Sequence, residues 1–374
     1  MDSKDKTFVV VMRGSSAVVF KQNDPLVLQI DTPEYGVLKI SYATRWITRG
    51  ENITSPGQMW IEIRGKGDEL EKVLNVYGKM GMFGLALLSV AANAAIGDVE
   101  LELGYETTRN IKERDYFQRF LPNESGDVFS FNKVNVKATL EFMSFIRTHN
   151  EQERIFRAAN QYRLALDWWK LGGESMCIAH LWMAIEALTK AFLREELIKY
   201  KLGSPGELAN KLKIDIKQLD ANIRKDLILK GDEECYKKAL DVSNGIEHGY
   251  LNYDVIRDKA TDIRPRLAKY VRDAILELSG ITNQLFKTLT TTPYDKPSAI
   301  GPLVRYLRGK LIGEGEALAK EGSEYPFVHW KCEIESFKEN EQGKFDVSFN
   351  DELKPELAQG IGFKPMSHEV WKLE

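Results

Sequence analysis

The feature that most constrains this chain is a helical pattern that continues with few interruptions from Glu151 to Leu289. Apolar side chains recur there at spacings of three and four, which places them on one face of each helix. Glycine and proline interrupt the pattern at residues 172–173 and 203–206. Helices joined by short connections bury their apolar faces against one another. The sequence therefore predicts an all-helical bundle over residues 150–290.

The glycine and proline breaks also predict where each helix of the bundle begins and ends. The expected helices are a first one from 151 to about 171, then 174–200, 205–213, 215–229, 232–248 and a long last one over 254–289. Asp254 is expected to cap the last helix, because an aspartate side chain accepts hydrogen bonds from free backbone N–H groups.

The segment before the bundle has a different pattern. Residues 7–65 contain short runs of β-branched and aromatic residues between turn signals, which predict strands. Residues 68–95 turn helical, and 99–107 predict a further strand. Residues 134–146 predict one more strand or a lead-in to the bundle, and 120–130 predict a loop. We therefore expect a β-rich α+β domain over residues 1–140.

The segment after the bundle begins with three prolines, which mark its exit. Residues 305–321 predict a helix. Two β-rich runs, 327–337 and 344–349, flank Gly343 and predict a β-hairpin. The predicted architecture is a multi-domain α+β protein, with domains at 1–140, 150–290 and 300–374, the last being a helix plus a β-hairpin.

Composition and charge exclude several classes of protein. The net charge of −3 gives no overall positive field, so any contact with nucleic acid would be local. Cys177, Cys235 and Cys332 form no CxxC pair and no ligand set with histidine, which argues against a disulfide framework and a zinc site. We expect no cofactor and no metal, and a cytoplasmic location.

One run, Met80–Gly97, is apolar enough to suggest a membrane span. It contains Ser89, Asn93 and several small residues, and no basic or aromatic belt flanks it. We therefore expect an interior helix that packs on the N-terminal sheet. The N-terminus is short, charged and then strand-like, which is unlike a signal peptide. No membrane partner is expected.

Motifs of nucleotide-binding loops, kinases, serine hydrolases and zinc proteases do not occur in the sequence. One local constellation stands out at residues 243–249, which close a predicted helix. Asn244 and His248 lie four residues apart and so project from one face. Gly249 is a plausible helix cap. A histidine in this position is also common simply as a capping residue near the negative end of a helix.

The bundle resembles the HEPN superfamily, and within it the bacterial Apea-like branch. The resemblance covers about 140 residues and rests on the segment LWMAIEAL at 181–188, on the Asn244-to-Gly249 segment and on the order of the helices. It implies a homodimer in which the histidines of two subunits meet. Active members of the superfamily cut RNA without a metal, with four to six residues between an arginine and the histidine that follows it.

The resemblance implies catalytic-site roles for His248, for Asn244 as an orienting group and for Glu186 on the second helix of the bundle. A histidine transfers protons near neutral pH, and an arginine would stabilise the negative phosphorane. This chain departs from the motif, because Asp241, Val242 and Ser243 occupy the three arginine positions. Arg224 is the candidate substitute from elsewhere in the chain.

Three hypotheses follow. The first is a catalytically degenerate HEPN-like module that binds nucleic acid or regulates, in bacterial RNA biology or in defence against phage and mobile elements. The second is an active HEPN-type ribonuclease with a rearranged site. The third is a dimeric interaction protein that contacts protein partners through its β-rich flanks, with no nucleic acid involved. In all three we expect a homodimer through the bundle, with Trp168, Trp169 and Trp182 as core or interface aromatics.

Overall fold

The computed structural model describes residues 6–49, 53–108, 114–118, 132–170, 172–249, 251–299, 304–313, 318–323, 326–339 and 345–371. These residues form two compact units. The first takes in the described residues of Met1–Arg45, Gln58–Glu124 and Ser130–Ile300, and the second takes in those of Trp46–Gly57 and Gly301–Glu374.

The N-terminal part is a six-stranded sheet with the order β3-β4-β5-β1-β6-β7. Its strands are β1 (Lys6–Ser16), β3 (Leu26–Thr32), β4 (Gly36–Arg49), β5 (Ile53–Gly67), β6 (Ile96–Glu106) and β7 (Tyr116–Gln118). The central strand β1 runs antiparallel to both neighbours, so that Val10 lies opposite Ile63 on one side and Gly104 on the other. A short parallel pair, β2 (Val18–Val19) and β8 (Asn132–Lys133), stands apart from this sheet.

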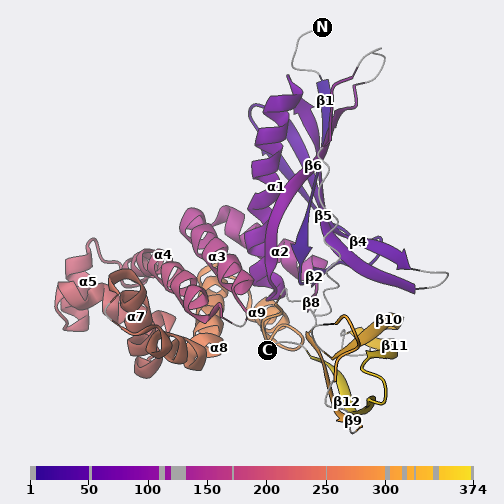
Figure 1. Cartoon of the computed structure of the whole chain (residues 1–374). Helices are drawn as coiled ribbons and strands as arrows, with labels where there is room; N and C mark the ends of the chain where they lie inside the picture. Colours follow the sequence, from indigo (N-terminus) through magenta and orange to yellow (C-terminus); the bar gives the residue numbers. More distant parts are fainter. Residues whose placement is uncertain are drawn as a thin grey trace. The chain divides into compact units, whose positions relative to one another are not determined.

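Helix α1 (Leu70–Ala92) lies along the sheet (Figure 1). It approaches closely because two small residues face the strands. The hydroxyl of Tyr42 on β4 donates to the carbonyl of Gly81 at 3.0 Å. A Cβ atom at Gly84 would stand 2.2 Å from the same hydroxyl oxygen. Glycine at this position therefore sets the distance between helix and sheet.

The helical part follows in chain order from α2 to α9 (Figure 1). The helices are α2 (Val136–Thr148), α3 (Gln152–Asp167), α4 (Glu174–Tyr200), α5 (Pro205–Leu212), α6 (Leu219–Asn222), α7 (Glu233–His248), α8 (Tyr253–Leu278) and α9 (Asn283–Thr290). A 3₁₀ turn, η2 (Ile216–Gln218), and a π-helical turn, η3 (Ile223–Ile228), flank α6. α4 packs against α3, α7 and α8, which makes it the central helix of the bundle.

One continuous core joins the sheet, α1 and the bundle. Val10 on β1, Leu88 on α1, Ile155 on α3 and Ala268 on α8 all belong to it and are inaccessible to solvent. The predicted domain 150–290 and most of the predicted domain 1–140 thus lie in one compact unit and share their apolar interior, whereas Trp46–Gly57 belongs to the second unit. That the two segments are separate domains, each able to fold alone, stays a prediction.

The second unit contains two strand pairs. β10 (Phe327–Glu339) pairs antiparallel with β11 (Phe345–Glu356), and β9 (Val304–Ile312) pairs antiparallel with β12 (Gly362–Trp371). The first pair confirms the predicted β-hairpin strands. The helix expected at 305–321 is wrong, because β9 occupies most of its first half in extended conformation.

The structure confirms a mixed α+β protein and most of the predicted helices, with corrections. The helix predicted at 254–289 is two helices, because the left-handed Gly280 ends the first and Thr282 caps the second. The N-cap of α8 is Asn252, and Asp254 lies in the first turn. Residues 136–148 are helical, with Asn135 accepting from the N–H of Ala138. The loop expected at 120–130 lies outside the described residues.

The apolar run at 80–97 proves to be two elements. Helix α1 ends at Ala92, Asn93 adopts the left-handed conformation, and β6 begins at Ile96. In the described part of the chain, α1 and α4 are long and apolar enough to cross a membrane, but 56% of the most apolar window of each is buried inside the fold. Such burial is typical of the core helices of water-soluble proteins.

Candidate functional site

The predicted site begins with the way α7 is closed at both ends. Asp232 caps its start by accepting from the backbone N–H of Cys235 at 3.0 Å. At the other end, Gly249 takes a φ of 64° and donates its N–H to the carbonyl of Gly245 at 3.0 Å. Glycine takes this left-handed conformation without steric cost, so the helix ends here. His248 therefore occupies the last turn, as the sequence predicts.

The side chain of His248 is accessible to solvent, with 68% of its area exposed. Its Nε2 atom lies 4.0 Å from a carboxylate oxygen of Glu247. Asn244 is half-buried one turn earlier. In the described part of the chain, no hydrogen bond joins His248 to Asn244 or to any arginine. The histidine faces solvent and has no cationic partner among the described residues of its own chain.

The three positions where the HEPN motif would carry arginine differ in their surroundings. Ser243 is buried, and its hydroxyl lies 3.4 Å from a carboxylate oxygen of Glu247. Val242 is fully buried. Asp241 reaches the surface and accepts from Nζ of Lys259 at 2.6 Å. Only the last of these positions could present a long cationic side chain to solvent without disrupting the core.

Glu186 lies in a different cluster, on α4. Its carboxylate pairs with the guanidinium of Arg224 at 3.7 Å, and Nε of Arg224 donates to the hydroxyl of Thr189 at 3.2 Å. The same guanidinium stacks over the ring of Trp182 at 5.4 Å. The arginine considered as a substitute is thus engaged with α4. The structure does not bring Glu186 or Arg224 into contact with His248.

The corner where α7 leads into α8 exposes several apolar side chains. Ile246 near the end of α7 is 38% exposed, and Tyr253 and Val255 in the first turn of α8 are 59% and 42% exposed. These three residues and His248, which we call the α7–α8 corner, lie on either side of the connection between the two helices. Exposed apolar side chains that gather in one place mark interaction surfaces more often than scattered ones do.

Four basic residues of the neighbouring helix are already paired with acids. Along α8, Arg257 pairs with Asp254, Lys259 with Asp241, Arg266 with Glu234 and Lys269 with Asp273. This salt-bridged face is the arrangement that the alternating charges predict. Its cations are partly neutralised, which weakens their attraction for phosphate groups.

Two of the three tryptophans singled out by sequence serve the core. Trp182 and Trp169 are buried, and Trp182 packs near Tyr236 with ring centroids 5.9 Å apart. Two cysteines, Cys177 and Cys235, are buried as well, and burial raises the pKa of each thiol to about 12. Neither is poised as a nucleophile at neutral pH. Among the described residues, no three potential metal ligands lie close together.

Comparisons with family models, with curated proteins and with solved structures find no match to this chain. The resemblance to the HEPN superfamily therefore stays a prediction that depends on residues 181–188, on residues 243–249 and on helix order.

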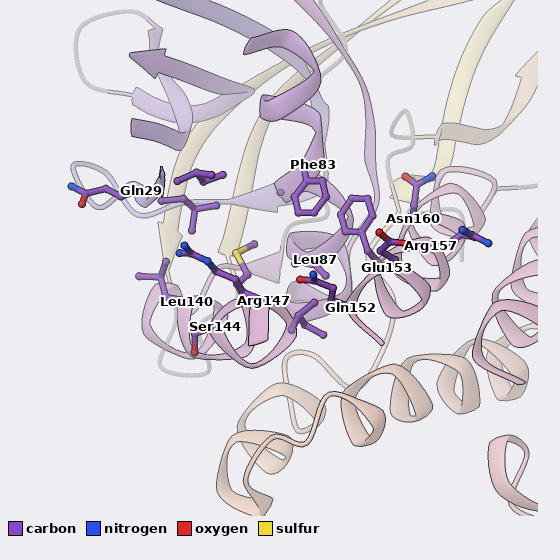
Figure 2. A pocket seen from close by; sticks show the side chains of 16 residues that line it. Gln29, Phe83, Leu87, Leu140, Ser144, Arg147, Gln152, Glu153, Arg157 and Asn160 are labelled. Carbon is purple, nitrogen blue, oxygen red and sulfur yellow. The ribbon is translucent and has the colours of Figure 1, made fainter. Parts of the chain in front are cut away.

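A cavity of about 760 Å³ lies elsewhere in the first unit, between β3, α1, α2 and α3 (Figure 2). Its wall is mainly apolar, and several polar side chains stand among the lining residues, including Arg147, Gln152 and Glu153. The sequence did not predict it, because its lining comes from four segments between residues 28 and 160. The one local indication of the cavity is Phe83, an aromatic residue of α1 whose surface is 50% exposed.

Proposed function

We propose that this chain is a homodimeric interaction protein that pairs with a second copy through the α7–α8 corner. The observation that carries the proposal is the exposure of Ile246, Tyr253, Val255 and His248 at the junction of α7 and α8. Interface centres are enriched in aromatic residues, and this corner combines a tyrosine with two aliphatic side chains. The exposed carboxylates of Glu247 and Asp254 lie beside them in the sequence.

A second copy is the occupant that this corner suits best. In a two-fold symmetric contact the same patch meets itself, so apolar side chains face apolar side chains without any separate complementary surface. Tyr253 can bury its ring while its hydroxyl stays hydrated at the rim. The two His248 side chains would then lie near each other, the arrangement that the HEPN resemblance implies.

Two observations favour an interaction protein over an enzyme that cuts RNA. No arginine of the described chain contacts His248, and Arg224 is held by Glu186 and Thr189. Removing one electrostatic donor from a transition state costs about a hundredfold to a thousandfold in rate. A lone histidine at this corner therefore supports little or no cleavage.

Light scattering during gel filtration tests the dimer. We expect the full-length protein at micromolar concentration to give twice the chain mass of 42.7 kDa. The double variant Tyr253→Ser/Val255→Ser should shift to the monomer mass, because both changes remove apolar surface without touching the core. Ile198→Ser is the matched control, since Ile198 is 63% exposed on α4 and should leave the dimer intact. A monomeric wild type contradicts the proposal.

A second candidate is the catalytically degenerate, HEPN-like module that binds nucleic acid in the bacterial cytoplasm, in RNA biology or phage defence. The exposed His248 with Asn244 one turn earlier supports it, because both can donate hydrogen bonds to phosphate or base edges. Titration of a labelled single-stranded RNA at several salt concentrations tests this candidate. Binding that weakens with salt and is lost in His248→Ala/Asn244→Ala would favour it over the protein-only function.

A further inference from the structure

The cavity between β3, α1, α2 and α3 is bordered by the free edge of a sheet. β3 stands at the end of the strand order and pairs only with β4 among the described strands. Three consecutive residues of β3, Leu28 to Ile30, line the cavity. Because side chains alternate between the two faces of a strand, consecutive lining residues indicate that the backbone edge itself borders the cavity. Every second residue of such an edge directs its N–H and C=O away from its partner strand.

The floor of the cavity is apolar and partly open to solvent. Phe83 of α1 and Phe156 of α3 stack with ring centroids 3.9 Å apart and an angle of 8° between their planes. Figure 2 shows Phe83 among the lining side chains, above Leu87 and Gln152. Phe83 nevertheless keeps half of its surface exposed. Further apolar contacts come from Leu140, Met143 and Ile146 on α2. Phe83 thus keeps apolar surface open to solvent, whereas Met143 and Ile146 are buried.

Two cations among the lining residues lack partners. Arg147, near the end of α2, and Arg157 of α3 are both exposed and make no ion pair or hydrogen bond within the described residues. This contrasts with α8, where four basic side chains are each paired with an acid. Glu153 is the one acidic residue in the lining. The cavity therefore favours an occupant that carries negative charge.

We propose that this groove binds an extended segment of a partner protein, which adds to the β3 edge as a further strand. Alternate apolar side chains of the segment would pack on Phe83 and on the apolar face of α2, and an acidic group would pair with Arg147. This names the partner class of the interaction protein proposed above, and binding at the groove does not require the dimer. In strand addition, main-chain hydrogen bonds supply affinity and side-chain pockets supply specificity.

An extended peptide accounts for all three features of the groove, which are the free edge of β3, the apolar floor and the two unpaired arginines. An apolar carboxylate such as a fatty acid could use the phenyl rings and one arginine, but it would leave the backbone groups of β3 without hydrogen-bond partners. A second copy of the chain would bring its own cationic groove to this one. Only a peptide supplies N–H and C=O groups in register with the edge, together with apolar and acidic side chains.

Fluorescence polarisation with the full-length protein tests the proposal. The probe is a labelled heptapeptide with isoleucine at every second position, threonine between, and an aspartate at its free C-terminus. Its companion carries two adjacent prolines at the centre, one of which must remove an N–H that faces β3. We expect the first peptide to bind and the second to bind at least about tenfold more weakly. The amides of β3 should also gain protection from hydrogen exchange.

Matched variants locate the binding site. Phe83→Ala and Arg147→Glu should each weaken binding about tenfold, as loss of an anchor does. Met82→Ala and Lys137→Glu are the controls, because both residues are exposed on the same helices and neither lines the cavity. They should stay within about twofold of the wild type. Thermal unfolding of each variant shows that folding is retained.

Three results would overturn the proposal. The first is equal binding of the diproline peptide, and the second is no loss of binding in Phe83→Ala and Arg147→Glu. The third is binding of dodecanoate, in a manner that depends on Phe83, without binding of the peptide. Retained peptide binding by the monomeric Tyr253→Ser/Val255→Ser variant would separate this groove from the dimer contact. Conversion of the dimer to a monomer by Phe83→Ala would show that a second copy occupies the groove instead.

Discussion

The hydroxyl of Tyr162 on α3 donates to Oδ1 of Asn93, the residue that ends α1, at 2.7 Å. Nδ2 of the same asparagine donates to the carbonyl of Tyr294 at 2.8 Å. Tyr162 and Asn93 are both buried. One left-handed residue after α1 thus connects α1, the bundle and the segment after α9, which are far apart in the sequence.

Removing this hydroxyl should destabilise the protein. Tyr162→Phe keeps the ring but leaves a buried amide oxygen without its donor, which costs about 1–3 kcal/mol. Tyr236→Phe is the control, since the hydroxyl of this half-buried tyrosine makes no hydrogen bond within the described residues and its ring contact with Trp182 would persist. Urea unfolding of both variants measures the difference. Equal free energies of unfolding would show that the Asn93 contact contributes nothing.

Two glycines of α1 should respond in opposite directions to the same substitution. Gly78→Ala meets no atom within 4 Å and should stabilise the protein by up to about 1 kcal/mol through helix propensity. Gly84→Ala would place its Cβ 2.2 Å from the hydroxyl oxygen of Tyr42. We expect it to cost about 1–3 kcal/mol, because the helix or the tyrosine must shift. Melting temperatures that rise for both variants would contradict the close packing of α1 on β4.

Several parts of this fold follow from local pattern. The helix at 174–200 was predicted with its bounds, because its apolar residues recur with helical period and glycines precede it. β9 does not follow from the sequence, because its alternation of apolar and charged residues is short and residues 305–321 predict a helix instead. The segment that contains α2 has Val134 and Val136 at its start, and this alternation favours a strand. Its buried residues Ala138, Phe142 and Ile146 nevertheless recur every four positions, which is helical spacing.

Some features of the candidate sites likewise follow from local pattern, and others depend on contacts between distant segments. The exposed His248 before a glycine cap was predictable, because both residues belong to one helix end. The pairing of Glu186 with Arg224 and the groove beside β3 were not, since each depends on contacts between segments whose relative positions no local pattern specifies. Burial of Ser243 was also hidden from the sequence, and it changes how the missing arginine should be tested.

Arg272 on α8 should be essential for stability. Its buried guanidinium donates to the carbonyls of Val90 at 2.8 Å and Tyr294 at 3.1 Å, and to two further carbonyls. Arg272→Ala would leave these acceptors unsatisfied and open a cavity, at a cost of at least about 3 kcal/mol. Arg266→Ala, at a surface ion pair, should cost about 1 kcal/mol or less. Soluble yield and thermal unfolding distinguish the two.

Stability in acid should depend on Glu151, which precedes α3. Burial opposes its ionisation, but hydrogen bonds from Arg154 at 2.8 Å and Arg194 at 2.5 Å outweigh this and lower its pKa below the ordinary 4.5. Because the folded-state pKa is the lower one, the stabilisation is complete above pH 4.5 and is lost as the pH falls through the folded-state value. Glu151→Gln should lower the free energy of unfolding at pH 7 and reduce its dependence on pH below 4.5.

The exposed Glu153, two residues further on, supplies the control for the acid experiment. Glu153→Gln should leave both the stability at pH 7 and its dependence on pH close to those of the wild type, because Glu153 makes no ion pair within the described residues. Unfolding by urea at a series of pH values measures both quantities. Parallel curves for Glu151→Gln and the wild type would show that the two arginines do not hold the carboxylate in its ionised form.

The last prediction concerns cleavage of RNA. We expect little or no ribonuclease activity from the wild type, since His248 lacks an arginine partner. Introducing one at Ser243 would bury a cation and should unfold the end of α7. Asp241→Arg is the better variant, because the Asp241 side chain is 45% exposed and lies seven residues before the histidine, within the motif spacing.

If the α7–α8 corner is a degenerate HEPN site, Asp241→Arg should gain cleavage of a single-stranded RNA, and the added His248→Ala should abolish it. Asp258→Arg provides a control, since it adds the same charge on α8 outside the motif. Strong cleavage by the wild type that disappears in His248→Ala would contradict the prediction and make the chain a ribonuclease with a rearranged site. If Asp241→Arg does not cleave RNA although the protein is a confirmed dimer, there is no reason to treat His248 as a former catalytic group.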